Sequence, residues 1–377
     1  MADAPAATTF GLDVAPQGAA DDVDHPVITA SVKTEDMAFI REAAKLARDH
    51  STASPAIYWA DFLASALLGY AALALAILAG PWAGKMAAGA VAVLALYRAS
   101  SFIHEITHLK SSAVPGFRIG WNLIIGIPML IPSFLYEGTH NQHHNKTRYG
   151  TADDPEYLPL ARMKPYSLIL FLVVSALGPI GFLIRFAVLS PLSLLSSRVR
   201  QEIVARFSTL SINPAYRRAL PTGQFAQDWH IMEAATSLWA IGIVAALSTG
   251  WIPVPAFLTC FAVLSGALII NQVRTLVAHL WDNDGDAISV TAQYLDSVNV
   301  PPPTVLPALW APVGLRYHAL HHLMPSVPYH ALGIVHHKLM AVVPADSPYH
   351  GGNHTGLRVL VQRLLRNTVR RHSAKTA

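Results

Sequence analysis

Residues 57–80 read IYWADFLASALLGYAALALAILAG, and residues 86–102 read MAAGAVAVLALYRASSF. The first run is almost wholly apolar, and at about 1.5 Å per residue it would extend roughly 36 Å as a helix. That length crosses the hydrocarbon core of a bilayer with some tilt. The glycines, proline and tryptophan of residues 80–84 predict a tight turn at the membrane interface. The two runs therefore predict a transmembrane helical hairpin.

Two later apolar runs, residues 231–249 and 255–277, flank a Gly-Trp-Ile-Pro turn and predict a second hairpin. The run at residues 121–136 is shorter and is interrupted by glycine and proline, which favours a re-entrant or interfacial piece. Residues 166–195 are apolar but are broken by Gly-Pro-Ile-Gly, so a kinked span and a membrane-dipping element both stay open. The expected fold is an all-α integral-membrane bundle of about four transmembrane helices, with interfacial or re-entrant helices and a cytoplasmic helical cap that carries the metal site.

The distribution of charge predicts the organisation and sidedness of the chain. Arginines gather at residues 198–218 and near the C-terminus, and basic residues favour the cytoplasmic side of a membrane protein. We expect a disordered cytoplasmic tail at residues 1–34, one membrane domain at residues 35–360 and a basic cytoplasmic tail at residues 361–377. Both termini and the polar end of the bundle should then lie in the cytoplasm.

The composition narrows the chemistry. Hydrophobic residues make up 53% of the chain and charged residues only 13%, which favours a membrane protein. The single cysteine, Cys260, excludes a disulfide within the chain and a cysteine-built iron–sulfur or zinc site. The net charge of +4 is spread between apolar runs, so a nucleic-acid partner is not expected. Eighteen histidines make imidazole the expected metal ligand.

Eight histidines fall into three short clusters near predicted helix ends. The clusters read HEITH at residues 104–108, HNQHH at residues 140–144 and HALHH at residues 318–322. Spacings of three and four place the imidazoles of each cluster on one face of a helix. The histidines are His104, His108, His140, His143, His144, His318, His321 and His322.

Eight imidazoles exceed the three or four ligands of a typical zinc site, so they fit two metal ions with open positions. The hairpin at residues 231–277 adds two crossings between the second and third clusters. These clusters can therefore meet only if residues 166–195 do not cross the membrane.

The three clusters resemble the histidine boxes of the membrane fatty acid desaturase family, one box of the HxxxH or HxxxxH type and two of the HxxHH type. Residues 321–330, HHLMPSVPYH, also resemble the usual continuation of the third box, and the resemblance covers about residues 55–340. It implies a further ligand at His279, near the end of the last apolar helix. Some members have an asparagine four residues earlier, where this chain has Thr275.

The resemblance implies an oxidoreductase of lipid and fatty acid metabolism. Two iron ions would be held by the nine histidines and dioxygen would be a co-substrate. The expected activity is that of a fatty acyl desaturase, which introduces a double bond into a lipid or acyl-thioester substrate. No cysteine cluster or nucleotide-binding glycine motif is present, so electrons should come from an external ferredoxin, rubredoxin or cytochrome-type donor.

Four carboxylates lie close to the first two clusters in the sequence. A carboxylate can accept a hydrogen bond from the second ring nitrogen of a ligating histidine and so fix its orientation. The candidates for this role are Glu105, Glu137, Asp153 and Asp154. Solvated helix ends or turns are the alternative for all of them.

Three alternatives remain open from the sequence. Hydroxylases, ketolases and alkane oxygenases use similar histidine boxes, and only the product separates them from a desaturase. A membrane zinc protease could use His104 and His108 with Glu105 as the base, but this site needs one more ligand and leaves six histidines unused. A metal transporter is less favoured, because transport sites lie near the bilayer midplane and these clusters lie at helix ends.

Overall fold

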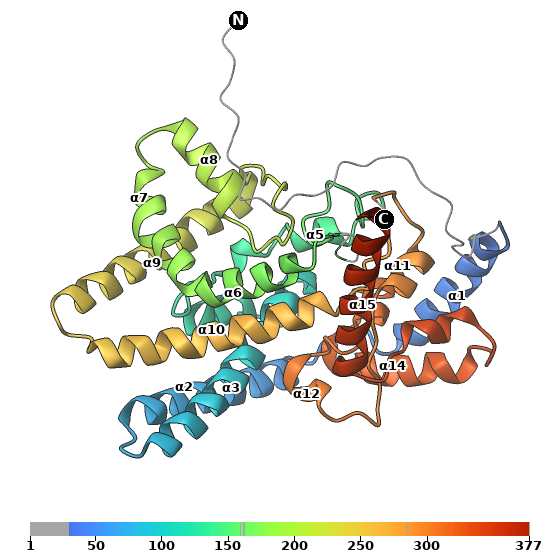
Figure 1. Cartoon of the computed structure of the whole chain (residues 1–377), viewed down its shortest axis with the longest axis horizontal. Helices are drawn as coiled ribbons and strands as arrows, with labels where there is room; N and C mark the ends of the chain where they lie inside the picture. The colour runs from blue at the N-terminus through green and yellow to red at the C-terminus, as the bar shows by residue number, and fades with distance from the viewer. Residues whose placement is uncertain (1–29, 159, 161–162, 284, 377) are drawn as a thin grey trace, which may run out of the picture.

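The computed structural model describes residues 30–158, 160, 163–283 and 285–376, with side chains between residues 37 and 369. Every regular element in these ranges is helical, and isolated bridges are the only sheet-like pairings there. The prediction of an all-α fold is therefore confirmed for the described residues. Long helices extend to one side in Figure 1, and short helices gather at their other end.

Both predicted hairpins are present. The first consists of α2 (Pro55–Leu78) and α3 (Trp82–His108), and the second of α9 (Gly223–Ser248) and α10 (Val254–Leu276). Proline occupies the first turn of α2, where its missing N–H costs no hydrogen bond. The helices of the first hairpin approach closely at Gly69, where an added Cβ would lie 2.7 Å from Cδ2 of Leu96.

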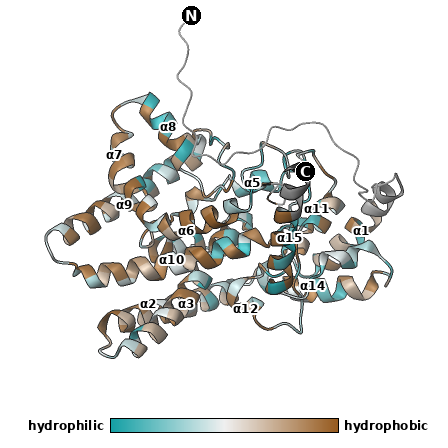
Figure 2. Ribbon diagram, viewed as in Figure 1, coloured by the Kyte–Doolittle hydropathy of each residue, from teal (hydrophilic) through white to brown (hydrophobic). Residues whose placement is uncertain are grey.

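Five helical segments are long and apolar enough to cross a membrane. Four belong to the two hairpins, and the fifth covers Tyr166–Leu192, whose role the sequence left open. Figure 2 shows these apolar segments on one side, with more hydrophilic residues around the short helices. The number of segments that cross and the side on which the short helices lie stay predictions.

The chain runs through the fifth apolar segment and then turns back in the elements that follow it. Pro179 lies inside α6 (Tyr166–Ile184) without ending this helix. The side chain of Ser196 caps the N-terminus of α8 (Ser197–Phe207), the helix on which the chain returns. The successive elements are α6 (Tyr166–Ile184), a π-helical turn η4 (Arg185–Leu189), α7 (Ser190–Leu192) and α8 (Ser197–Phe207).

This excursion begins and ends beside the same stretch of chain. Leu160, shortly before α6, packs in one buried cluster with Tyr149 and Tyr157. After α8, the backbone N–H of Asn213 donates to the carbonyl of Pro155 at 3.1 Å. The chain therefore returns by residue 213 to the stretch from which the excursion began, and the condition that residues 166–195 do not cross the membrane stays a prediction.

Residues 121–136 form only short pieces, in agreement with the predicted interruption. They include the end of α4 (Phe117–Trp121), a π-helical turn η1 (Asn122–Gly126) and a 3-10 turn η2 (Ser133–Leu135). The side chain of Asn122 bonds both the backbone N–H and the hydroxyl of Ser133, at 2.8 Å each. This link closes the broken segment on itself.

The remaining helices pack around the ends of α3 and α10. A buried cluster that includes Phe39, Tyr294, Leu320, Val335 and Tyr349 joins five of them. They are α1 (Ala30–Arg48), α5 (His140–His143), α11 (Val290–Asp296), α12 (Pro307–Trp310), α13 (His318–Leu323), α14 (Tyr329–Val342), η5 (Pro348–Gly352) and α15 (Leu357–Thr376).

The inner ends of the two predicted tails overlap described helices, and the domain boundaries themselves stay predictions. Residues 1–29 of the N-terminal tail lie outside the described residues, but α1 already begins at Ala30. At the other end, the predicted boundary at residue 360 falls inside α15, whose Leu360 and Leu364 are buried. Apolar residues spaced four apart bury one face of this basic helix, a pattern that its many arginines obscure.

Candidate metal centre

All nine histidines named from the sequence gather in two neighbouring groups. Within each group, one nitrogen from every histidine lies within 4.8 Å of all the others. His108 and His144 are partly exposed and the other seven are buried. One group contains His104, His108, His140, His144 and His321, and the other contains His143, His279, His318 and His322.

The five-histidine group is assembled from α3, α5 and α13. His104 and His108 are one turn apart at the end of α3, with ring centroids separated by 5.2 Å. The Nε2 atom of His144, which caps α5, lies 3.0 Å from Nε2 of His140 and 3.1 Å from Nε2 of His321. Three segments that are distant in the sequence therefore direct imidazole nitrogens at one point.

The four-histidine group adds the segment that follows α10. His279 lies three residues beyond the end of that helix, and its Nε2 is 3.1 Å from Nε2 of His318. Nε2 of His318 is in turn 3.2 Å from Nε2 of His322. The ring centroid of His143 lies 5.1 Å from that of His279 and so completes the group.

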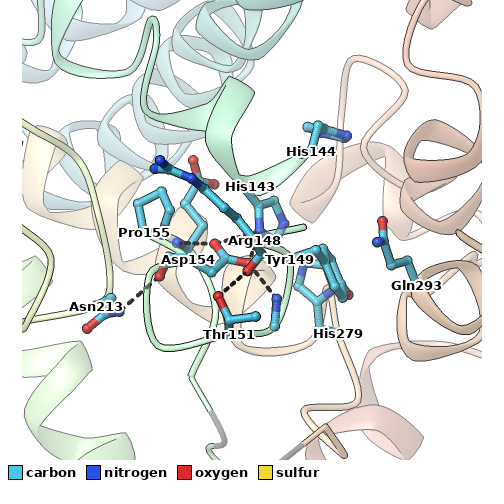
Figure 3. Close-up of polar contacts among 12 residues, drawn as sticks. His143, His144, Arg148, Tyr149, Thr151, Asp154, Pro155, Asn213, His279 and Gln293 are labelled. Carbon is cyan, nitrogen blue, oxygen red and sulfur yellow. Dashed lines mark hydrogen bonds and ion pairs between the residues drawn. The ribbon is translucent and has the colours of Figure 1, made fainter. Parts of the chain in front are cut away.

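Two carboxylates of the loop after α5 hold histidines of both groups. Asp154 Oδ2 lies 2.9 Å from Nδ1 of His143, as Figure 3 shows, and Glu156 Oε1 lies 3.0 Å from Nδ1 of His140. Each carboxylate can only accept, so each Nδ1 donates its proton and leaves its Nε2 lone pair free. The carboxylates thus orient the imidazoles for ligation through Nε2.

A tyrosine connects His279 to a third carboxylate. The hydroxyl of Tyr149 donates to Asp296 at 2.8 Å and lies 2.9 Å from Nδ1 of His279, beside which it is drawn in Figure 3. The hydroxyl of Ser297 also lies 3.1 Å from this nitrogen. Because the tyrosine proton is used on Asp296, the tyrosine oxygen can accept from Nδ1 of His279.

The sequence suggested four carboxylates that could orient a histidine, and only one of them lies within hydrogen-bond distance of a histidine ring. This is Asp154. Glu105 lies 3.7 Å from Nδ1 of His104, but it accepts from the hydroxyl of Tyr58 and the backbone N–H of Tyr329.

The other two candidates have different surroundings. Glu137 pairs with Arg118 at 2.6 Å, and Asp153 is exposed to solvent. Glu156 and Asp296 were missed because neither lies at a recognisable spacing from a histidine box. The only signal for Glu156 was its position two residues after Asp154.

Several ring nitrogens in these groups have no hydrogen-bond partner. Both ring nitrogens of His104 and Nε2 of His108 are buried without a hydrogen bond. Lone pairs that face each other at about 3 Å repel, and a buried polar atom without a partner costs on the order of 1–3 kcal/mol. A cation between the rings would remove both costs, so the donor sets fit metal ions.

Most histidines of the two groups are in the neutral form that can bind a metal. Burial lowers the pKa of His140, His144, His279 and His318, which keeps these imidazoles neutral and able to bind a metal. Burial also disfavours the charged form of His143, but the neighbouring Asp154 carboxylate outweighs this effect and raises the pKa of His143. His143 is thus the ligand most closely tied to its carboxylate.

Comparisons with known proteins agree with the family expected from the histidine boxes. The fatty acid desaturase family model matches residues 80–353. A ceramide hydroxylase from Caulobacter vibrioides is 46% identical over 322 residues, which cover 85% of this chain and 92% of that protein. No solved structure matches.

The five-histidine group also bears on the zinc protease alternative. His104 and His108 share their group with three further histidines, whereas a catalytic zinc site takes three protein ligands in all. Together with the match over residues 80–353, this favours an oxidoreductase. The chain belongs to the fatty acid desaturase family.

Proposed function

We propose that this chain is a membrane-lipid hydroxylase that inserts one oxygen atom from dioxygen into a C–H bond of a ceramide-type N-acyl lipid. The observation that carries this proposal is the 46% identity to a ceramide hydroxylase over 92% of its length. The sequence alone favoured desaturation, because both reactions use the same histidine boxes. The relative shifts the preference to hydroxylation.

In this proposal the five-histidine and four-histidine groups each hold one iron ion. When bound, the irons would supply the reduction of dioxygen and the oxidation of the substrate C–H bond. The chain contributes the position of the ligands: Asp154 and Glu156 fix the imidazoles of His143 and His140. Burial of seven of the nine histidines keeps bulk water away from the oxidising centre.

The reaction needs electrons that the chain does not store. One oxygen atom enters the product and the other leaves as water, which consumes two electrons and two protons. With Cys260 as its only cysteine, the chain has no ligands for an iron–sulfur cluster of its own. An external ferredoxin, rubredoxin or cytochrome-type donor would reduce the irons, from the cytoplasmic side if the charge distribution sets the orientation.

Reconstitution tests this dependence. Purified protein in lipid vesicles should turn over with a reduced donor and should stop when the donor is withheld. Activity that is indifferent to added donor would contradict an external source of electrons.

Desaturation is the second candidate, because the matched family model describes fatty acid desaturases. In that reaction two hydrogen atoms leave the chain and both oxygen atoms end as water. The same lipid substrate would then lose two hydrogens rather than gain an oxygen.

Product analysis separates the two candidates. The chain and its His143→Ala variant are expressed in a host that makes saturated ceramides, under isotopically labelled dioxygen. We expect ceramides that carry one labelled oxygen with the unchanged chain and none with the variant. Products that lack two hydrogens and carry no label would replace hydroxylation by desaturation.

A further inference from the structure

Three arginines are deeply buried among the described residues, and two of them have obvious partners. Arg185, 3% exposed, forms an ion pair with Glu233 at 2.6 Å. Arg218, 8% exposed, donates to three backbone carbonyls. Arg274, also 8% exposed, lies in the last turn of α10 and has no side-chain hydrogen bond or ion pair to any described residue.

The isolation of Arg274 is costly. Its Nε is buried without a hydrogen-bond partner, and burying part of a charged group without compensation is unfavourable. Its charge is felt by His279 and His318, which oppose it, and by the Glu156 carboxylate, which partly offsets it without a hydrogen bond. An oxygen acceptor that arrives with a ligand would supply the missing partner.

The structure provides a cavity for such a ligand. Arg274 and His318 line the same small cavity, of about 10 Å³, which has room for a group of roughly the size of one water molecule. The second cation in its wall, Arg316, already donates to the carbonyls of Val300 and Thr304. Arg274 is therefore the uncommitted cation of the cavity, and His318 of the four-histidine group, whose Nδ1 also has no hydrogen-bond partner, lies in the same wall.

The rest of the wall is apolar and leads to an exposed apolar loop. Val277, Val298 and Trp310 line the cavity beside the two arginines. Just before Trp310, Val305 and Leu306 are 78% and 66% exposed. The hydroxyl of Tyr97 on α3 donates to the carbonyl of Trp310, which fixes this loop against an apolar hairpin. A lipid chain can thus lie on apolar surface while its polar group meets Arg274.

We propose that Arg274 is a substrate-positioning residue that binds the amide carbonyl oxygen of an N-acyl lipid. This assignment rests on the proposed function. Because the carbonyl site and His318 share one cavity, the carbons on either side of the amide linkage lie nearest the four-histidine group. Oxidation then occurs beside the amide and not in the middle of the acyl chain.

A carboxylate could use the same donor, so a free fatty acid is the alternative source of the oxygen acceptor. Binding measurements on the iron-loaded protein in detergent can distinguish the two, with the fluorescence of the tryptophans, including Trp310 in the cavity wall, as the signal. The probes are a saturated N-acyl sphinganine, a fatty acid of the same chain length and an alkane of that length. The variants are Arg274→Gln and, as a control, Arg358→Gln, which removes an exposed arginine of α15.

We expect Arg274→Gln to weaken binding of the N-acyl sphinganine about tenfold or more, because a hydrogen bond to a charged group is lost. Binding of the alkane should stay unchanged, and Arg358→Gln should bind all probes as the unchanged chain does. Unaltered binding of the N-acyl sphinganine by Arg274→Gln would overturn the assignment. A loss confined to the fatty acid would replace the amide carbonyl by a carboxylate.

A second measurement separates this inference from the proposed function. Mass-spectrometric fragmentation of the product should place the new hydroxyl on a carbon next to the amide linkage. Hydroxylation in the middle of the chain would overturn the role of Arg274 and leave hydroxylation intact. Loss of two hydrogens with weakened binding by Arg274→Gln would overturn hydroxylation and leave the binding site intact.

The variant must also fold and load iron for these results to count. Arg274→Lys retains the charge but not the planar fork of donors, so it should recover part of the lost affinity. If Arg274→Gln lost iron or unfolded, Arg274→Lys would carry the binding test alone. If folded Arg274→Lys protein bound the N-acyl sphinganine as tightly as the unchanged chain and placed the hydroxyl on the same carbon, the assignment would be overturned.

Discussion

Asp154 accepts hydrogen bonds from a histidine and from the backbone in the candidate metal centre. Besides Nδ1 of His143, it accepts from the backbone N–H groups of Gly150 and Glu156, both at 2.8 Å. Those backbone bonds fix the carboxylate, and the carboxylate in turn fixes the imidazole. Carboxylates in this position typically contribute a factor of about 10–100 to metal affinity.

We therefore expect Asp154→Asn to bind iron about 10–100-fold more weakly than the unchanged chain. Metal titration of the purified apoprotein measures this affinity. The adjacent Asp153→Asn offers a matched control, because Asp153 is exposed and its side chain touches no histidine. Equal iron affinity in the two variants would show that Asp154 does not support a metal ligand.

The histidines of the site were predictable from the sequence and most of their supports were not. Spacings of three and four place imidazoles on one helical face whatever the rest of the fold, so local geometry was enough to name them. Asp296 lies 4.0 Å from Nδ1 of His279 and is connected to it by hydrogen bonds through Tyr149, which lies 147 residues from Asp296 in the sequence. No local pattern records a contact of this kind.

Between helices, a buried ion pair ties the excursion of α6 to the second hairpin. Arg185 in η4 meets Glu233 in α9, and Arg200 of α8 reaches the same carboxylate at 2.6 Å. The side chains of Arg185 and Glu233 are only 4% and 6% exposed. Removing one partner would leave a buried charge without compensation.

Glu233→Gln should therefore lower the free energy of unfolding by about 3–5 kcal/mol. Glu202→Gln is the matched control, because Glu202 forms an exposed ion pair with Arg206 that is worth at most about 1 kcal/mol. Unfolding in mixed detergent micelles gives both values. If the two variants lost the same small amount, the buried pair would not hold α6 and α8 to α9.

The long helices were predictable because a run of apolar residues determines them almost alone. Residues 166–195 show the limit of prediction from apolar runs. Gly178 and Pro179 indicated a break, although α6 continues through them. The helix continues although Pro179 has no backbone N–H to donate. The π-helical turn comes later, at Arg185. Arg185 in that turn pairs with Glu233 across the interface, a contact that no local pattern reports.

At the scale of the whole molecule, the two histidine groups join α3, α5, α13 and the segment after α10. We expect removal of iron to lower the melting temperature by several degrees, because a ligand bound only by the folded state stabilises it. Protease cleavage near the exposed residues 145–148, directly after the second cluster, should also increase. Thermal unfolding and limited proteolysis with and without a chelator measure both effects.

A histidine outside the two groups provides the control. His350 bonds the carbonyl of Pro344 and belongs to neither group, so His350→Ala should keep its iron and its melting temperature. A melting temperature unchanged by iron removal would mean that the folded chain gains nothing from the ions. The two groups would then not be metal sites of the resting protein.

The order of residues along the chain also limits when the centre can form during synthesis. His143 is translated well before the second hairpin, while His318 and His322 of the same group come near the end. Until those two residues have left the ribosome, the nascent protein has its apolar helices but only half of this coordination shell. If this group binds an ion as proposed, the complete set of ligands would form only after the apolar helices have been made.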